Sequence, residues 1–201
     1  MGRYSSDKGG SFQSAPIGTH LGRCIKIIDI GTQKMEDFDG NPTKKNQVII
    51  GWELPDELMS DGKPFVISKF YTNSLHKKAS LRHDLEQWRG RAFSDEELKR
   101  FDLAQIIGRA CMVSIIAKPA GNGTKVSSVT ALPRGMNVPD QVNQSVIFWL
   151  DEFNQTIFDG LSDGLKKLIE KSDEFRAMQE TGETGEPAET HLEPVDDEVP
   201  F

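Results

Sequence analysis

Strand-like segments dominate the first two thirds of the chain, and one segment of helical period interrupts them. Alternating β-branched and aromatic residues indicate strands, and they occur over residues 19–31, 46–54, 64–72, 109–118 and 124–132. After the third of these segments, Leu81, Leu85 and Trp88 recur at helical spacing, which predicts a helix over residues 75–88. The predicted order is therefore three strands, a helical insert and a two-strand hairpin.

Turn and capping residues separate these segments. Asp39-Gly40-Asn41-Pro42 marks a turn within a polar loop over residues 32–46, and Pro55 is expected to end the second strand. The other signals are Asn73 or Ser74 as the first helix cap, Gly90 at its end, a capping box over residues 94–97, a helical turn over residues 102–107 and a hairpin turn over residues 121–123.

This order of elements matches an OB-fold, a five-stranded Greek-key barrel with a helix between its third and fourth strands. A generic β-sandwich is the alternative, but it usually has about seven strands. We therefore predict a mainly β protein with added helices. Its barrel is expected to span residues 17–135, after a flexible N-terminal arm over residues 1–16.

A helical extension is expected to follow the barrel. Residues 146–150 are apolar and read as extended or as the start of a helix. Hydrophobic spacing predicts a helix over residues 162–171, and Ser172 is a cap for one further turn. We expect this extension, residues 136–178, to pack on the barrel. A contact between two copies in a homodimer is the alternative.

The acidic charge of the chain is concentrated at its C-terminal end. Residues 180–201 contain eight Asp or Glu and no Lys or Arg. Without these eight charges, the formal net charge changes from −7 to +1. The acidic composition therefore describes a tail, predicted to be disordered over residues 179–201, and leaves a body that is compatible with nucleic-acid binding.

Cysteine usage and hydropathy indicate a cytoplasmic protein. Cys24 and Cys111 lie in strand-like runs and are too few for a disulfide framework, so we expect both to be reduced core residues. No run of 18 apolar residues predicts a membrane span. The first residues also lack the apolar segment of a signal peptide.

Motifs for catalysis and metal binding are not found in the sequence. The four histidines have no metal-binding spacing, and there is no HExxH, CxxC, phosphate-binding loop or nucleophile elbow. Paired acids such as Glu96 and Glu97 fit the start of a helix better than an active site. We therefore expect no enzymatic activity, no cofactor and no metal. A two-metal nuclease is the less favoured alternative.

Cations and aromatic side chains occur together between residues 69 and 91. Single-stranded nucleic-acid sites combine cations that follow the phosphates with flat rings that stack on bases. This pairing predicts a DNA-binding surface. The candidates are Lys69, Tyr71, Lys77, Lys78 and Arg82, with Trp52, Phe70 and Arg89 as weaker ones.

Strand and helix geometry leaves alternatives for several of these residues. Successive strand residues face opposite sides, so either Phe70 or Tyr71 faces the core, and we favour Tyr71 as the exposed ring. Trp52 is left open between base stacking and core packing, whereas Trp88 is expected in the core. Lys77, Lys78 and Arg82 form the cationic face of the predicted helix, and an ordinary solvated face is the alternative.

The last six residues combine acids with an apolar tip. They are Asp196, Asp197, Glu198, Val199, Pro200 and Phe201. Phe201 would anchor in a partner's pocket, and the acids would steer the encounter with a basic rim. A tail that only keeps the protein soluble is the alternative, although such a tail does not need an apolar end.

This ending closely resembles the acidic tip of bacterial and phage single-stranded DNA-binding proteins, in which a run of Asp precedes an aliphatic residue, Pro and Phe. Glu198 and Val199 stand where that pattern has Asp and Ile. Residues 70–98 are also similar to phage replication proteins of the single-stranded DNA-binding type. The resemblance implies an OB-fold that coats single strands in phage DNA replication, recombination or repair.

The resemblance also implies that the tip recruits other replication and recombination proteins in the cytoplasm of a bacterial host. The resulting expectation is a non-enzymatic protein that binds single-stranded DNA without sequence preference. The acidic tail would compete with DNA for the cations of the body. An adaptor module of a replisome, without DNA binding of its own, is the main alternative.

Overall fold

The computed structural model describes residues 13–37, 39–119, 121 and 123–181. Its strands are β1 (Gly18–Glu36), β2 (Pro42–Leu58), β3 (Pro64–Thr72), β4 (Ala110–Ala117), β5 (Thr124–Thr130) and β6 (Val146–Phe148). Its helices are α1 (Ser80–Arg89), α2 (Asp95–Lys99), α3 (Gln155–Gly160), α4 (Asp163–Glu170) and α5 (Asp173–Thr181), with a 3₁₀ turn over Leu103–Ile106. Most of the predicted arm and the acidic tip lie outside the described residues.

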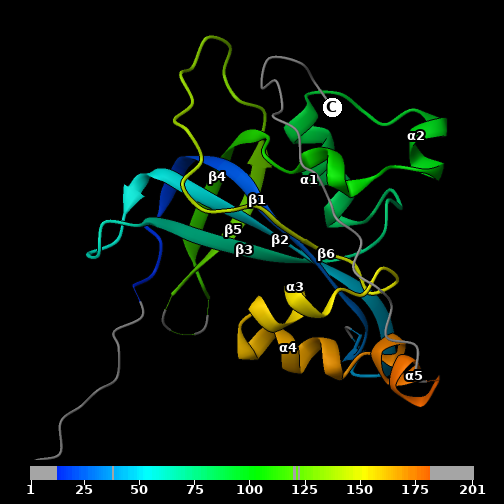
Figure 1. Cartoon of the computed structure of the whole chain (residues 1–201). Coiled ribbons are helices and arrows are strands. Elements are labelled where there is room, and N and C mark those ends of the chain that lie inside the picture. The colour runs from blue at the N-terminus through cyan, green and yellow to red at the C-terminus, as the bar shows by residue number, and fades with distance from the viewer. Residues whose placement is uncertain (1–12, 38, 120, 122, 182–201) are drawn as a thin grey trace, which may run out of the picture.

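The strands form one open sheet in the order β3-β2-β1-β4-β5, with antiparallel neighbours, and β6 pairs with β1 in parallel. The prediction of a mainly β protein with a helical insert after its third strand is confirmed. Figure 1 shows two helical groups, α1 with α2 and α3 with α4 and α5, on different sides of the strands. We call the sheet side that packs on α1 the inner face and the opposite side the outer face.

The hairpin of β1 and β2 is longer than predicted, and the prediction of a polar loop over residues 32–46 is wrong. The pairing register continues to Glu36 and Pro42, which leaves a short turn between them. Oδ1 of Asp37 accepts the backbone N–H of Asn41 at 2.8 Å and closes this turn. Polar residues on both sides of the turn therefore belong to paired strands.

The prediction that Pro55 ends the second strand is also wrong. β2 continues to Leu58, and its pairing with β3 shifts register between Leu54 and Leu58. Proline has no N–H to donate, and a strand accommodates it where the ladder is interrupted. The irregularity allows the chain to remain extended through Pro55.

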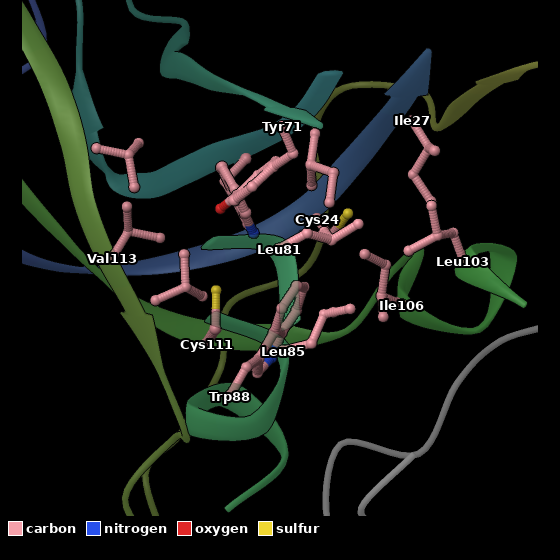
Figure 2. Close-up of a cluster of buried hydrophobic side chains, with 14 of the residues drawn as sticks. Cys24, Ile27, Tyr71, Leu81, Leu85, Trp88, Leu103, Ile106, Cys111 and Val113 are labelled. Carbon is pink, nitrogen blue, oxygen red and sulfur yellow. The ribbon is translucent and has the colours of Figure 1, made fainter. Parts of the chain in front are cut away.

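The inner face carries the main hydrophobic core. Leu81, Leu85 and Trp88 of α1 are buried there, which confirms the predicted stripe. The predicted burial of Cys24 and Cys111 is also confirmed, and both sulfurs lie within the cluster in Figure 2. Burial raises the pKa of the Cys24 thiol, which keeps it protonated and unreactive.

Two of the predicted helix signals are found in the insert. Gly90 follows α1 with a φ of 68°, a left-handed conformation that favours glycine. Ser94 caps α2 through a capping box in which its side chain accepts the N–H of Glu97. These signals are local in sequence, which explains why the residue pattern alone located them.

The outer face is partly covered by a second hydrophobic cluster. Its rings come from β6 and the segment that follows, and they pack against Ile28 and Ile49 of the sheet. The ring centroids of Phe148 and Phe153 are 5.6 Å apart, and those of Phe153 and Phe158 are 5.4 Å apart. This aromatic packing joins α3–α5 to the long β1–β2 hairpin.

The C-terminal helices follow the predicted pattern with one addition. Residues 146–150 are extended at β6, and α4 and α5 occupy the positions predicted from the hydrophobic spacing and from Ser172. The Ser172 hydroxyl accepts the N–H of Phe175 at 3.1 Å. The short helix α3 was not predicted, although Asn154 caps it by accepting the N–H of Ile157 at 3.1 Å.

A close backbone approach joins α5 to β1. At Gly31, which has a φ of 67°, an added Cβ would lie 2.7 Å from Cβ of Ser172, so only glycine fits. The neighbouring Thr32 donates its backbone N–H and its hydroxyl to the Glu174 carboxylate at 2.6 and 2.5 Å. Burial of Glu174 opposes its ionisation, but the bonds from Thr32 outweigh that effect and hold its pKa below the ordinary value of 4.5.

We therefore expect Glu174→Gln to destabilise the protein in a pH-dependent way. A carboxyl whose folded pKa is lowered contributes stability above its ordinary pKa of 4.5, and the contribution is lost as the pH falls through the lower folded value. Urea denaturation of wild type and variant should differ most at neutral pH and converge in acid. Glu180→Gln, at an exposed position of the same helix, is the matched control. A difference that does not depend on pH would contradict this assignment.

Part of the segment assigned to the N-terminal arm contacts the sheet. Ala15 is buried, and its carbonyl accepts the Thr124 hydroxyl at 3.0 Å. Oε1 of Gln13 accepts the Ser60 N–H at 3.0 Å.

Among the described residues, no helix has the length and hydropathy needed to cross a membrane.

Candidate nucleic-acid interface

The alternation of β3 determines which candidate aromatic is accessible. Phe70 is 52% exposed on the outer face, whereas Tyr71 is 2% exposed on the inner face. The prediction that Tyr71 is the exposed ring is therefore wrong. The Tyr71 hydroxyl donates to Oδ2 of Asp84 on α1 at 2.6 Å, a buried partner that a phenylalanine could not use. Figure 2 shows the Tyr71 ring among the core side chains, near Leu81.

Lys69 contacts the same buried carboxylate, that of Asp84, as Tyr71 does. Its ammonium lies 2.6 Å from Oδ2 of Asp84 and donates to the Ser127 carbonyl at 3.0 Å. It also lies 5.1 Å from the centroid of the Tyr71 ring. Burial and the Asp84 carboxylate raise the pKa of Tyr71. Lys69 therefore joins β3 to α1 and β5, and its charge is already compensated.

Arg89 has a structural position as well. Its guanidinium is fully buried, forms an ion pair with Glu97 and stacks 4.3 Å from the centroid of the Phe93 ring. Bonds from Arg91, from the Ser94 backbone and from Arg89 hold the pKa of Glu97 well below its usual range. Arg89 thus holds α2 against α1, and this contact leaves none of its side chain at the surface.

Trp52 belongs to the core, which resolves the alternative left open by its sequence position. It is 1% exposed, and its ring centroid lies 6.2 Å from that of Trp88 at an interplanar angle of 57°. The expected core position of Trp88 is confirmed. Neither tryptophan is available to a base in this structure.

Lys77 and Lys78 are exposed, but they precede α1 and do not lie on it. The predicted cap at Asn73 or Ser74 is wrong, because the Ser74 hydroxyl accepts a backbone N–H within the turn and the helix begins only at Ser80. The prediction that Lys77, Lys78 and Arg82 share a helical face is therefore also wrong, since only Arg82 is on the helix. Arg82 is half-buried and pairs with Glu86 at 2.8 Å.

The outer face presents a strip of small and polar residues beside Phe70. The pairing places Lys26 of β1 opposite Gly51 of β2, and Gly51 opposite Ser68 of β3. An added Cβ at Gly51 would lie 2.9 Å from the Ser68 hydroxyl oxygen and 3.1 Å from Cβ of Lys26. All three therefore point to the same side, and Gly51 keeps the surface between the two side chains low.

Lys26 adds positive charge on the first strand in the sequence, but it was not among the predicted site residues. Burial lowers the pKa of its ammonium, and within residues 13–181, gaps excepted, no carboxylate forms an ion pair with it. The available signal was its place as the one charged residue in the apolar run of residues 24–28. A half-buried lysine without an acidic partner favours an anion as its ligand.

The strip therefore combines a ring and a cation, the two groups that single-stranded nucleic-acid sites use together, with a hydroxyl. Phe70 offers a ring face, Lys26 offers a positive charge for phosphate, and Ser68 offers a hydroxyl. In the part of the chain that the structure describes, no three His, Cys, Asp or Glu side chains are placed to hold a metal ion. The sequence matches no protein-family model and no curated protein.

Proposed function

We propose that the chain binds single-stranded DNA, without reading its sequence, across the outer face of β1, β2 and β3. The observation that carries this proposal is Phe70, a phenylalanine 52% exposed in the middle of a well-formed strand. A large ring at such a position loses contact with water only when a ligand covers it. Bases stack on exposed rings whatever their identity, which gives affinity without sequence preference.

The position of the cation supports the same ligand. Lys26 and Ser68 are separated by one intervening strand, and strands are spaced about 4.8 Å apart. Phe70 lies two residues further along β3, so its Cα is about 12 Å from that of Lys26. A single DNA strand that crosses the face diagonally would reach both the Lys26 ammonium and the Phe70 ring. Lys77 and Lys78, exposed between the end of β3 and the start of α1, are two further cations that follow Phe70 closely in the sequence.

We further propose that the sheet is an OB-fold. The pairing of β1 with both β2 and β4, and the helix between β3 and β4, are the connections of that barrel. The bond from Lys69 of β3 to the Ser127 carbonyl of β5 brings the two ends of the strand order together. Ligands of this fold bind across its second and third strands, which is where Phe70 lies.

The acidic tip completes the proposal as a recruiting element. Asp196 to Phe201 lie outside the described residues, and their role rests on their chemistry and on the resemblance described above. In this scheme the body coats single strands during replication, recombination or repair, and the tip brings partner proteins to them. No catalytic step is proposed.

Phe70→Ala is expected to weaken binding to an oligo-dT strand by about 5- to 150-fold, because one stacked base contributes about 1–3 kcal/mol. The measurement is fluorescence anisotropy of a labelled strand at two salt concentrations, with duplex DNA in parallel. Ile116→Ala is the matched control, since it removes a 42% exposed apolar side chain from β4. That variant should bind as the wild type does.

Three outcomes would contradict the proposal: no binding at low salt, equal affinity for duplex, or an unchanged affinity of Phe70→Ala. A double variant, Lys77→Glu with Lys78→Glu, separates the adaptor alternative. A DNA-binding protein should lose affinity and show a shallower salt dependence. An adaptor has no DNA affinity to lose and keeps its protein partners.

A further inference from the structure

A cavity of about 370 Å³ lies beside the proposed DNA strip, where β6 meets α3 and α4. Lys26 lines this cavity, and carbons of its side chain also border Gly51 on the outer face, so the residue contributes to both surfaces. The cavity is within the size range of small-ligand sites, which begins at about 300 Å³. The proposed path of the DNA over Phe70 and Ser68 therefore meets the cavity at Lys26, the residue that the two surfaces share.

The walls of the cavity have two kinds of surface. Ile157 of α3, Leu161 between the two helices and Leu165 of α4 contribute apolar side chains. Gln144 and Thr156 contribute an amide and a hydroxyl, and both residues are exposed. Apolar walls suit the faces of a base, and amide and hydroxyl groups suit its polar edge.

The positive charge of Lys26 at the cavity favours an anionic ligand. Among the described residues, Lys26 is the one cation that lines the cavity, and no carboxylate lines it. Because burial already disfavours the charged ammonium, a phosphate beside it would restore a favourable environment. We propose that this cavity receives one nucleotide of the bound strand, with the base between α3 and α4 and the adjoining phosphate on Lys26. This inference rests on the proposed function.

A single nucleotide is the probe that tests the cavity separately from the strip. We expect dTMP to bind the full chain more tightly than thymidine, because thymidine lacks the phosphate. Chemical shifts of the backbone amides near residues 144–147 and 156–165 should change on addition of dTMP. Lys26→Met keeps the apolar stem and removes the charge, and should weaken dTMP binding by about tenfold or more.

A second variant closes the cavity without altering its charge. Thr156→Trp places a large ring at an exposed lining position, and should abolish dTMP binding and weaken oligo-dT binding. Gln155→Trp is the matched control, since the neighbouring exposed residue faces a different hollow, beside Phe175. It should bind both ligands as the wild type does. Circular dichroism and thermal unfolding confirm that each variant is folded.

The outcomes distinguish the two proposals. If the wild type fails to bind oligo-dT, the proposed function is wrong. If the wild type binds oligo-dT but not dTMP, or if Thr156→Trp binds oligo-dT as the wild type does, the strip stands and the cavity proposal is overturned. The last binding experiment uses a peptide of residues 196–201 in place of dTMP. If that peptide shifts the cavity amides and dTMP does not, the cavity takes a terminal carboxylate and not a nucleotide.

Discussion

Asp84→Leu is expected to lower the free energy of unfolding by about 3–5 kcal/mol, the cost of leaving a buried charge without its partner. The Asp84 side chain is 7% exposed, and one of its oxygens lies 2.6 Å from both the Lys69 ammonium and the Tyr71 hydroxyl. The substitution leaves a cation, 20% exposed, without its carboxylate partner and a buried hydroxyl without its acceptor. Urea denaturation followed by far-ultraviolet circular dichroism measures the loss.

Two further variants divide this loss between its causes. Tyr71→Phe removes one hydrogen bond to a charged group and should cost about 1.5–3 kcal/mol. Lys69→Met combined with Asp84→Leu leaves no uncompensated charge, so it should recover much of the stability that Asp84→Leu loses. Asp159→Leu, at an exposed position of α3, is the control for adding a leucine. A loss no larger than that of the control would show that the buried group does not hold α1 to β3.

The same variants bear on the DNA-binding assignment. Lys69 was predicted to contact phosphate, but its charge is used inside the protein. Lys69→Met should therefore reduce stability while leaving the salt dependence of DNA binding unchanged. A shallower salt dependence with unchanged stability would restore Lys69 to the interface.

Phe148→Ala is expected to lower the free energy of unfolding by about 3–5 kcal/mol, the range for deleting a buried phenylalanine ring. Phe148 is 1% exposed, and its ring centroid lies 5.6 Å from that of Phe153 and 6.1 Å from that of Phe158. Its backbone pairs with Ile28 of β1. Deleting the ring therefore leaves a cavity at the contact that holds the C-terminal helices on the sheet.

The comparison for this prediction is Phe148→Leu, which retains most of the apolar volume and should cost less than the alanine variant. Thermal unfolding and urea denaturation report the loss. An unfolding midpoint equal to that of the wild type would show that the second cluster adds little to stability. Because β6 also borders the cavity, the alanine variant should bind dTMP less tightly than the leucine variant does.

Several elements could be read from the residue pattern, because the signals for them are local. The alternation in β3, the stripe of α1, the capping box at Ser94 and the left-handed Gly90 each depend on residues within a few positions of one another. The strand boundaries were less accurate. Pro55 and the polar residues around Asp37 are accommodated by pairing with another strand, which a local pattern does not record.

The site was predicted only in outline. A concentration of cations and rings after residue 69 was visible, but proximity in sequence does not show which charges are already paired. Lys69 and Arg89 have acidic partners on α1 and α2 and are used in packing. Lys26 counted only as an added charge on the first strand, and its position between β2, β6 and α4 is given by the tertiary structure alone.

By itself, the sequence determined the order of the elements, the mainly β class and the separation of an acidic tip from a body of nearly neutral charge. Only the tertiary structure decided which of Phe70 and Tyr71 faces outward. A period of two requires one of them to face each side, but it does not say which. Asp84, on a different element, accepts the hydroxyl of Tyr71 in the core and so leaves Phe70 on the surface.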